Sequence, residues 1–521
     1  MKFTQQNKRF DFLFFALLLS GMLWILLLMQ GASFYFDEWD FLLKRDLNLE
    51  DLLQPHNGHF SFLPVLVFSV LRRVFGLTSY LPYQIAGLAT HSMVCAAVYA
   101  IIRKQSQFVA LCAGLLVCLL GTGWQNILWP FQMGTIGALA AGLWALYFID
   151  RREIPRWRVS LLLAISLAST GGGVAVAAVV VLLLAIRREW RAVFATCPVL
   201  LLYGIWYLNY GISQSQTGNL GKTPQYMIDS ALASAAGVGN RSSIFGVFVI
   251  CGILVLYLVK REETRLPSVQ NGILFLLFVT WCLTGLSRSH LGEPGASRYV
   301  YVGATCIVLV LCLMIPRPDN WLSKVGVAAV AVLLVLPNME LMQAGANGLL
   351  DTSQHLRAKL AAVENVRSSV QFDYSVDSAR APQLMVGEYF KAIDQFGSPA
   401  YSWQSLSKLD SLILNGVNQT ITESSSVMQL TNEDSCRIDE SATKTLYEIH
   451  PQTSLKLLIK APAQLNLNWF QKMPDAAYSL SISESGVYSV RNSIERQSNL
   501  LLVIDDMQSV AVCDKTNPKS N

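Results

Sequence analysis

The sequence predicts a mainly α-helical, polytopic membrane protein (a helical bundle of about eleven spans) with a C-terminal mixed α/β domain outside the membrane. Of its 521 residues, 53% are hydrophobic and only 14% are charged. Soluble globular proteins have roughly 25% charged residues, because their surface faces water. The composition therefore excludes an ordinary soluble enzyme, a disordered chain and a small disulfide-rich domain. The net charge of +5 does not indicate nucleic-acid binding, because the basic residues are spread over many short loops.

Apolar stretches long enough to cross a bilayer fill the first two thirds of the chain. A span needs about 20 mostly apolar residues. We expect the first span to be a retained signal-anchor, because its apolar stretch is longer than that of a cleaved signal peptide. The pair that meets at Gly171–Gly173 is short in each half and is compatible with one bent or broken helix. The expected spans are residues 11–31, 82–102, 107–123, 131–149, 158–170, 172–187, 193–211, 243–259, 271–287, 299–316 and 325–342.

Basic residues predict the orientation of these spans. If the N-terminus is cytoplasmic, 17 Lys and Arg residues fall on the cytoplasmic side and 8 in the opposite loops, as the positive-inside rule predicts. This orientation excludes residues 60–76 as a span and makes them an amphipathic helix in the outer interface. We therefore expect a multi-pass protein of a bacterial inner membrane, with its active site and C-terminal domain in the periplasm.

Two domains are expected from this arrangement. Residues 1–343 should form the transmembrane module, with a first outer loop at 32–81, and residues 344–521 an extracytoplasmic domain. The tail has a helical pattern at 351–369 and strand-like alternation after it, which predicts a mixed α/β fold.

The ten cysteines do not form a metal-binding pattern. Eight of them fall in or beside spans, where cysteine behaves as a small apolar residue. Cys436 and Cys513 lie in the tail, where an oxidising compartment would favour a disulfide between them. No spacing typical of a metal site occurs, so neither a metal nor a cofactor is expected.

Three carboxylates lie within four residues shortly after the first span. Asp37, Glu38 and Asp40 are flanked by the aromatic residues Phe36 and Trp39. Aromatic residues are common at the membrane interface, but acids are disfavoured there by the low dielectric. Crowding raises carboxylate pKa values, and a modestly raised pKa suits a general base near neutral pH. The alternative is an acidic cap on a helix N-terminus, where Asp and Glu are stabilised.

A pair of histidines follows in the same outer loop. His56 and His59 are three residues apart and could bind phosphate or sugar oxygens. The alternative is a solvated turn before the interfacial helix. No third ligand occurs at a fixed spacing, which makes a metal site between them unexpected.

Cations occupy a late outer loop, on the side that should be poor in positive charge. Arginine suits bidentate binding of phosphate, and that phosphate could belong to a substrate or to membrane lipids. The candidate phosphate-binding residues are Arg288, His290, Arg298 and Tyr299. Amides on the same side could bind sugar hydroxyls or serve as helix caps; these are Gln125, Asn126 and Gln132.

An acid cluster and a basic cluster at the outer membrane boundary suit transfer of a sugar from a lipid phosphate. The lipid tail of such a donor lies among the helices, which puts its phosphate at the interface. The acceptor hydroxyl needs a base, and the departing phosphate needs cations to stabilise its charge.

The stretch from Phe36 to Leu66 resembles bacterial polyprenyl-phosphate-sugar glycosyltransferases of the GT-C superfamily. Members have a D-E-W-D-like motif after the first span, then H-N-x-H, many spans and a C-terminal extracytoplasmic domain. Many read H-N-E-H-R where this chain has His56-Asn57-Gly58-His59-Phe60, so no role of the missing Glu and Arg is transferred to Gly58 and Phe60. The element Ser297-Arg298-Tyr299 adds to the likeness.

The resemblance implies an inverting, single-displacement glycosyltransferase that uses a polyprenyl-phosphate-linked sugar and no metal. It makes Asp37 the base, with Glu38 as the alternative base, and lets Glu38 or Asp40 orient the substrate. Arg298, with Arg288 and His290, would hold the lipid phosphate. His56 and His59 would line the donor pocket. The acceptor would be a glycan, a lipid or a protein.

Three other interpretations remain at this point. An O-antigen ligase or polymerase would act on lipid diphosphates, usually from a large late loop, which this chain lacks. A transporter or flippase would place ionisable residues near the bilayer midplane, where these spans have almost none. A sensor or assembly scaffold would use the tail to bind a partner.

Overall fold

A computed structural model describes residues 2–211, 217–259, 268–367, 375–422, 427–430, 446–470, 477–494, 499–504 and 508–513. The chain divides into two compact units. We call the first the membrane unit; it comprises Met1–Gln30, Arg45–Val74 and Tyr80–Leu349. The second, which we call the tail unit, comprises Gly31–Lys44, Phe75–Ser79 and Leu350–Asn521. Part of the first outer loop thus clusters with the tail.

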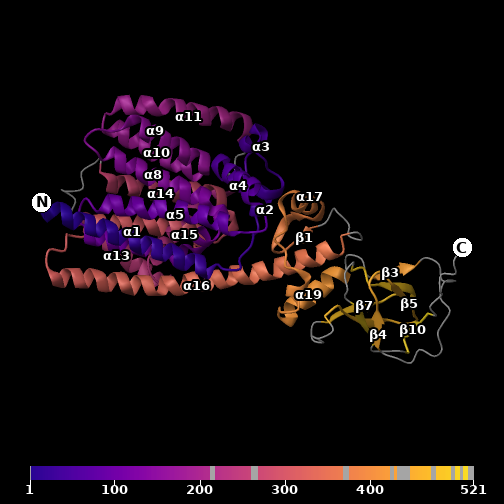
Figure 1. Ribbon diagram of the computed structural model, residues 1–521. Helices are drawn as coiled ribbons and strands as arrows, with labels where there is room; N and C mark the ends of the chain where they lie inside the picture. The colour runs from indigo at the N-terminus through magenta and orange to yellow at the C-terminus, as the bar shows by residue number, and fades with distance from the viewer. Residues whose placement is uncertain are drawn as a thin grey trace. The chain divides into compact units, whose positions relative to one another are not determined.

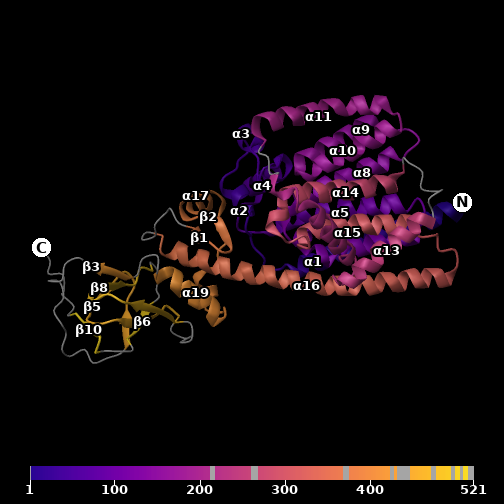
Figure 2. The same cartoon turned by 180° about the vertical axis from the view of Figure 1, so that it is seen from behind.

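Helices form nearly all of the membrane unit. In both views α5, α8, α9, α10 and α14 lie side by side (Figures 1 and 2). The α-helices are α1 (Lys2–Leu28), α3 (Leu49–Leu53), α4 (Phe62–Phe75), α5 (Leu81–Ile102), α6 (Gln107–Cys118), α7 (Trp124–Leu128), α8 (Met133–Ile149), α9 (Arg156–Ser169), α10 (Gly172–Ile186), α11 (Trp190–Tyr210), α12 (Thr223–Ala236), α13 (Ser243–Val259), α14 (Val269–Arg288), α15 (Ser297–Met314) and α16 (Trp321–Asn365). Short 3-10 helices are η1 (Gly121–Gly123), η2 (Pro130–Gln132), η3 (Thr217–Asn219) and η4 (Ser289–Leu291).

Each of the eleven predicted spans corresponds to one of these helices. Within the described residues, 8 helices are long and apolar enough to cross a membrane, and α10 and α13 are shorter apolar helices. The predicted amphipathic helix at 60–76 is α4, which buries Val65 and Phe68 and exposes Val70 and Val74. The predicted fold class, a polytopic helical bundle with a C-terminal mixed domain, is confirmed.

The glycine run at 171–173 separates two helices rather than bending one. Helix α9 ends at Ser169, α10 begins at Gly172, and the two helices pack against each other. A side chain at Gly173 would collide with the backbone of Ser166 and Leu167, so a glycine is needed where the helices approach. The tight connection leaves Thr170 and Gly171 at the end of the hairpin.

The tail unit combines helices with short antiparallel strands. Its helices are α2 (Glu38–Leu43), the end of α16, α17 (Val386–Phe396), α18 (Trp403–Leu406) and α19 (Ser411–Ile421). The predicted span at 325–342 and the first part of the predicted helix at 351–369 belong to the single helix α16, which ends at Asn365. Strands β1 (Ser375–Asp377) and β2 (Ala381–Met385) form a hairpin, with Ser375 opposite Met385 and Asp377 opposite Ala381.

Two four-stranded sheets complete the tail unit, with the strand orders β10-β5-β8-β3 and β4-β9-β6-β7. Buried and partly exposed residues alternate along β5 and β9, as the sequence predicted. Cys513 is disulfide-bonded, and its predicted partner Cys436 lies outside the described residues. The strands are β3 (Val427–Leu430), β4 (Leu446–Ile449), β5 (Ser454–Ile459), β6 (Ala463–Asn468), β7 (Tyr478–Ile482), β8 (Gly486–Arg491), β9 (Leu500–Ile504) and β10 (Val510–Val512).

Candidate active site

A cavity of about 330 Å³ lies within the membrane unit. This volume is in the range of small-molecule sites. Helices α8, α10, α11, α12, α14 and α15 line it, together with the turn before α4 and the connection between α9 and α10. Five of the residues predicted from the sequence line this one cavity: His59, Gln132, Arg288, Arg298 and Tyr299.

The cavity is cationic where α14 ends and apolar further back along this helix. Arg288 is the last residue of α14, while Leu276 lines the cavity twelve residues earlier. At 1.5 Å per residue this separation is about 18 Å. Leu139 of α8 and Val176 of α10 add to the apolar wall. The cavity therefore suits an amphipathic ligand with an anionic group and an apolar chain.

The two arginines of the cavity differ in their surroundings. Arg298 lies 3.5 Å from the exposed Glu293, and its guanidinium lies 5.0 Å from the centroid of the Tyr299 ring. Arg288 has no hydrogen bond or ion pair with an acidic group among the residues that the structure describes. A cation beside a cavity, without a carboxylate to balance it, is available for an anionic ligand.

His56 and His59 frame a tight hairpin turn. The backbone amide of each donates to the carbonyl of the other, at 3.0 and 2.9 Å. Asn57 and Gly58 both have positive φ angles, of 48° and 73°, as a type I′ turn requires. An Asn-Gly pair is a strong hairpin signal, so the sequence contains the signal for this turn. Phe60 stacks on Trp206 with ring centroids 4.5 Å apart, which fixes the turn against α11.

The turn directs the two histidines differently. His56 is buried and packs edge-on against the ring of Phe131, with centroids 5.3 Å apart. His59 lines the cavity, where burial, and then the charge of Arg288, lower its pKa to about 4. His59 is therefore neutral at physiological pH, so its imidazole can exchange hydrogen bonds with a polar ligand without adding charge.

Gly171 and Gly172 provide a matched pair of substitutions that tests the position of His59. A Cβ atom at Gly171 would lie 2.6 Å from His59 Nδ1, whereas at Gly172 the nearest atom is Thr170 Cγ2 at 3.6 Å. We expect Gly171→Ala to displace His59 and to lower the free energy of unfolding by about 1–3 kcal/mol, as overpacking does. Gly172→Ala should change it little. Equal thermal unfolding curves for the two purified variants would contradict this placement.

Four predicted residues outside the acidic motif do not line the cavity. Gln125 Oε1 accepts a hydrogen bond from the backbone amide of Arg298 at 3.2 Å, so Gln125 caps the first turn of α15. His290 is exposed, and its Nδ1 lies 3.2 Å from Asn219 Nδ2. Asn126 is buried without a hydrogen-bond partner in the described part of the chain, and the fourth residue is His56.

Several cavity residues were not predicted. Tyr203 and Tyr207, one helical turn apart on α11, line the cavity, as does Trp281 of α14. Thr280 and Thr284 continue the polar stripe that ends at Arg288. Their spacing of four residues places them on one helix face, which is the signal that could have found them.

Two hydroxyl groups near the arginines are buried without a hydrogen-bond partner among the described residues. They belong to Ser230, which lines the cavity and is 3% exposed, and to Tyr226, which is 5% exposed. A buried polar group without a partner costs free energy. A polar ligand in the cavity would supply a partner to Ser230.

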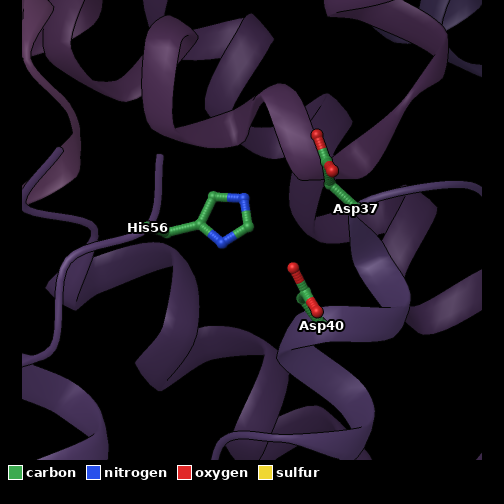
Figure 3. Close-up of side chains that lie close together, drawn as sticks. All are labelled: Asp37, Asp40 and His56. Carbon is green, nitrogen blue, oxygen red and sulfur yellow. The ribbon is translucent and has the colours of Figure 1, made fainter. Parts of the chain in front are cut away.

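The acidic motif begins helix α2 in the tail unit. Asp37 is the N-cap residue and Asp40 lies one turn further on, so the two carboxylates come within 4.8 Å of each other (Figure 3). Asp37 Oδ1 accepts a hydrogen bond from Gln383 Nε2 at 2.9 Å, and Asp40 pairs with Lys44 at 2.9 Å. His56, also labelled in Figure 3, belongs to the membrane unit.

Glu38 differs from the two aspartates in its burial. Its side chain has 0% exposure, and Oε2 accepts a hydrogen bond from the backbone amide of Tyr35 at 2.8 Å. This bond closes the turn that leads into α2, which is the helix-cap alternative weighed from the sequence. Asp37 and Asp40 are partly exposed, so they are better placed for proton transfer. Their oxygens are also the ligand type that Mg²⁺ and Ca²⁺ prefer, and the absence of a metal stays a prediction.

The chain resembles a known protein in structure rather than in sequence. No protein-family model matches it, and no curated protein matches its sequence. Among solved structures, it is similar to ArnT from Cupriavidus metallidurans, in a crystal structure bound to undecaprenyl phosphate, with a TM-score of 0.44 and 13% sequence identity. The alignment covers 70% of this chain and 81% of that one. The activity of this chain is therefore inferred from the residues of its own cavity.

Proposed function

We propose that the protein is a membrane glycosyltransferase that takes a sugar from a polyprenyl-phosphate donor. The observation that supports this most directly is the polarity of the cavity. Arg288 and Arg298 lie at one end of it, and apolar side chains such as Leu276 lie further back along α14. A lipid phosphate has the same polarity, with a charged head and an apolar chain.

The uncharged polar residues of the cavity suit a carbohydrate. Neutral His59, the amide of Gln132 and hydroxyl groups on α11, α12 and α14 line the cavity. Gln132 is held by a hydrogen bond to its Oε1 from Thr135 Oγ1 at 3.1 Å. Uncharged donors and acceptors of this kind bind sugar hydroxyls, while the arginines bind the phosphate.

The chemistry is a single displacement with inversion at the anomeric carbon. A carboxylate, which we assign to Asp37, takes the proton of the acceptor hydroxyl. The hydroxyl oxygen then forms a bond to the anomeric carbon while the bond from that carbon to the phosphate oxygen breaks. The electron pair remains on the polyprenyl phosphate, whose added charge Arg288 and Arg298 stabilise. Glu38 holds the turn before α2, and Asp40, paired with Lys44, orients the acceptor.

A transfer assay with two donors tests the proposal. The purified full-length protein is incubated with a polyprenyl-phosphate sugar or with the matching polyprenyl-diphosphate sugar and an extract of envelope glycans and lipids. We expect sugar transfer and release of polyprenyl phosphate from the first donor. Mass spectrometry of the purified protein should also detect bound isoprenoid phosphate. Transfer from the diphosphate donor alone would instead support the ligase or polymerase interpretation, and transfer from neither donor would reject the proposal.

A further inference from the structure

A side chain from the C-terminal part of the chain contacts the proposed base. Gln383, on strand β2, donates a hydrogen bond from Nε2 to Asp37 Oδ1 at 2.9 Å. The two residues are 346 positions apart in the sequence and belong to the same compact unit. The carbonyl end of the amide cannot donate, so only the amino group of Gln383 can pair with an ionised carboxylate.

The strand that holds Gln383 is anchored on both sides. In the turn between β1 and β2, Asp377 accepts hydrogen bonds from the backbone amides of Ala379 and Arg380, at 3.1 and 3.0 Å. The Asp377 carboxylate also pairs with Lys359 of α16 at 3.0 Å. Burial alone would raise the pKa of Asp377, but these hydrogen bonds and charges outweigh it and lower the pKa. The hairpin is therefore tied to α16 by an ionised carboxylate.

Helix α2, which begins after Asp37, is equally well supported. Trp39 is fully buried and packs edge-on against the ring of Tyr389, with centroids 6.0 Å apart. Tyr389 in turn donates a hydrogen bond to Glu364 of α16 at 2.6 Å. Both partners of the contact between Gln383 and Asp37 are thus built on packed elements, as a preoriented catalytic group requires.

The carbonyl end of the Gln383 amide accepts no hydrogen bond from the described residues. Its Oε1 atom is buried and has no hydrogen-bond partner among the described residues. A buried carbonyl oxygen without a donor costs free energy. An amide with a purely structural role would be expected to satisfy both ends, so this cost indicates that the orientation of the amino group toward Asp37 matters.

We propose that Gln383 is a positioning residue that orients the Asp37 carboxylate and stabilises its charged form. This inference rests on the proposed function, in which Asp37 must be ionised to accept the acceptor proton. A hydrogen bond to the charged form of a carboxylate favours that form. The β1–β2 hairpin is then a part of the catalytic apparatus, because it supplies a hydrogen-bond donor to the base.

Gln383→Met tests this role, because methionine retains the length of the side chain and removes the donor. We expect kcat to fall about 10- to 100-fold, as the loss of a hydrogen bond to a charged group does, with the KM of the donor unchanged. The acidic limb of the pH–rate profile should move to higher pH. The matched control is Gln464→Met, which replaces an exposed glutamine on β6 and should behave as wild type. A fall in kcat without a shift in the pH profile would overturn the proposal.

A second measurement does not depend on activity. Carbodiimide modifies protonated carboxyl groups, so labelling of Asp37 across a pH series, read by peptide mass spectrometry, reports its protonation directly. The midpoint should lie at higher pH in Gln383→Met than in wild type or Gln464→Met. An unchanged midpoint would refute the positioning role. A shifted midpoint in a protein that transfers no sugar would retain the positioning role and reject the proposed function. If Gln383→Met unfolds, Gln383→Asn, which shortens the reach of the amide, replaces it in both measurements with the same expectations.

Discussion

Asp37→Asn is expected to fold as wild type and to lose 10²- to 10⁴-fold of its transfer activity, the usual contribution of a general base. Asparagine has the shape of aspartate but cannot accept the proton of the acceptor hydroxyl. Asp37 is the N-cap residue of α2 and makes no side-chain capping bond, and Asn is as favourable as Asp at this position. The loss should appear in kcat, measured with saturating donor and acceptor.

The matched control for this substitution is Asp410→Asn. Asp410 is also an N-cap aspartate, at the start of α19, and it too makes no side-chain capping bond. It should retain full activity. If Asp37→Asn transferred sugar at a near-normal rate while Asp40→Asn did not, the base would have to be reassigned to Asp40.

Arg298→Ala should weaken the use of the lipid donor more than the use of the acceptor. Its guanidinium lines the cavity, and its pairing with Glu293 at 3.5 Å involves a carboxylate that is 69% exposed, which water screens strongly. A charge-assisted hydrogen bond to phosphate is worth about 1.5–3 kcal/mol, so kcat/KM for the donor should fall about 10- to 100-fold. Initial rates at varied donor and fixed acceptor measure this effect.

Arg317→Ala is a suitable comparison, because its side chain is 65% exposed and lies 4.0 Å from Asp319 in the loop after α15. It should leave the kinetics unchanged. Arg298→Lys should recover only part of the loss, since lysine retains the charge but not the planar fork of guanidinium. An Arg298→Ala variant with normal donor kinetics, or with a defect confined to the acceptor, would remove Arg298 from the phosphate site.

The membrane bundle could be predicted because a bilayer-facing surface requires long stretches of apolar residues and few charged ones. Arg288, Arg298 and Gln132 lie near the ends of spans, where a charged or amide side chain stands out against apolar neighbours. His59 lies in a loop between spans, where a pair of histidines is also easily noticed. Tyr203 and Trp281 could not be identified in this way, because an aromatic residue inside a span is normally part of the core. Only their spacing to other polar residues indicates that they line a cavity.

Other features depended on contacts that a single sequence does not contain. Gln125 is an amide at the end of a predicted span, as a sugar ligand would be, but it caps α15. The contact between Gln383 and Asp37 joins residues 346 positions apart, and neither flanking segment has a pattern that predicts pairing. The clustering of Gly31–Lys44 with the tail could not be predicted either, because it depends on packing between segments far apart in the sequence.

Arg288 has no acidic partner among the residues that the structure describes, and this has a practical consequence for handling the protein. A ligand that binds only the folded protein raises the melting temperature of the protein, and the effect grows with the logarithm of the ligand concentration. Anionic amphiphiles should therefore protect the detergent-solubilised protein against heat, and neutral ones of equal chain length should not. A simple melting screen across lipid head groups would then rank candidate ligands before any sugar or acceptor is known.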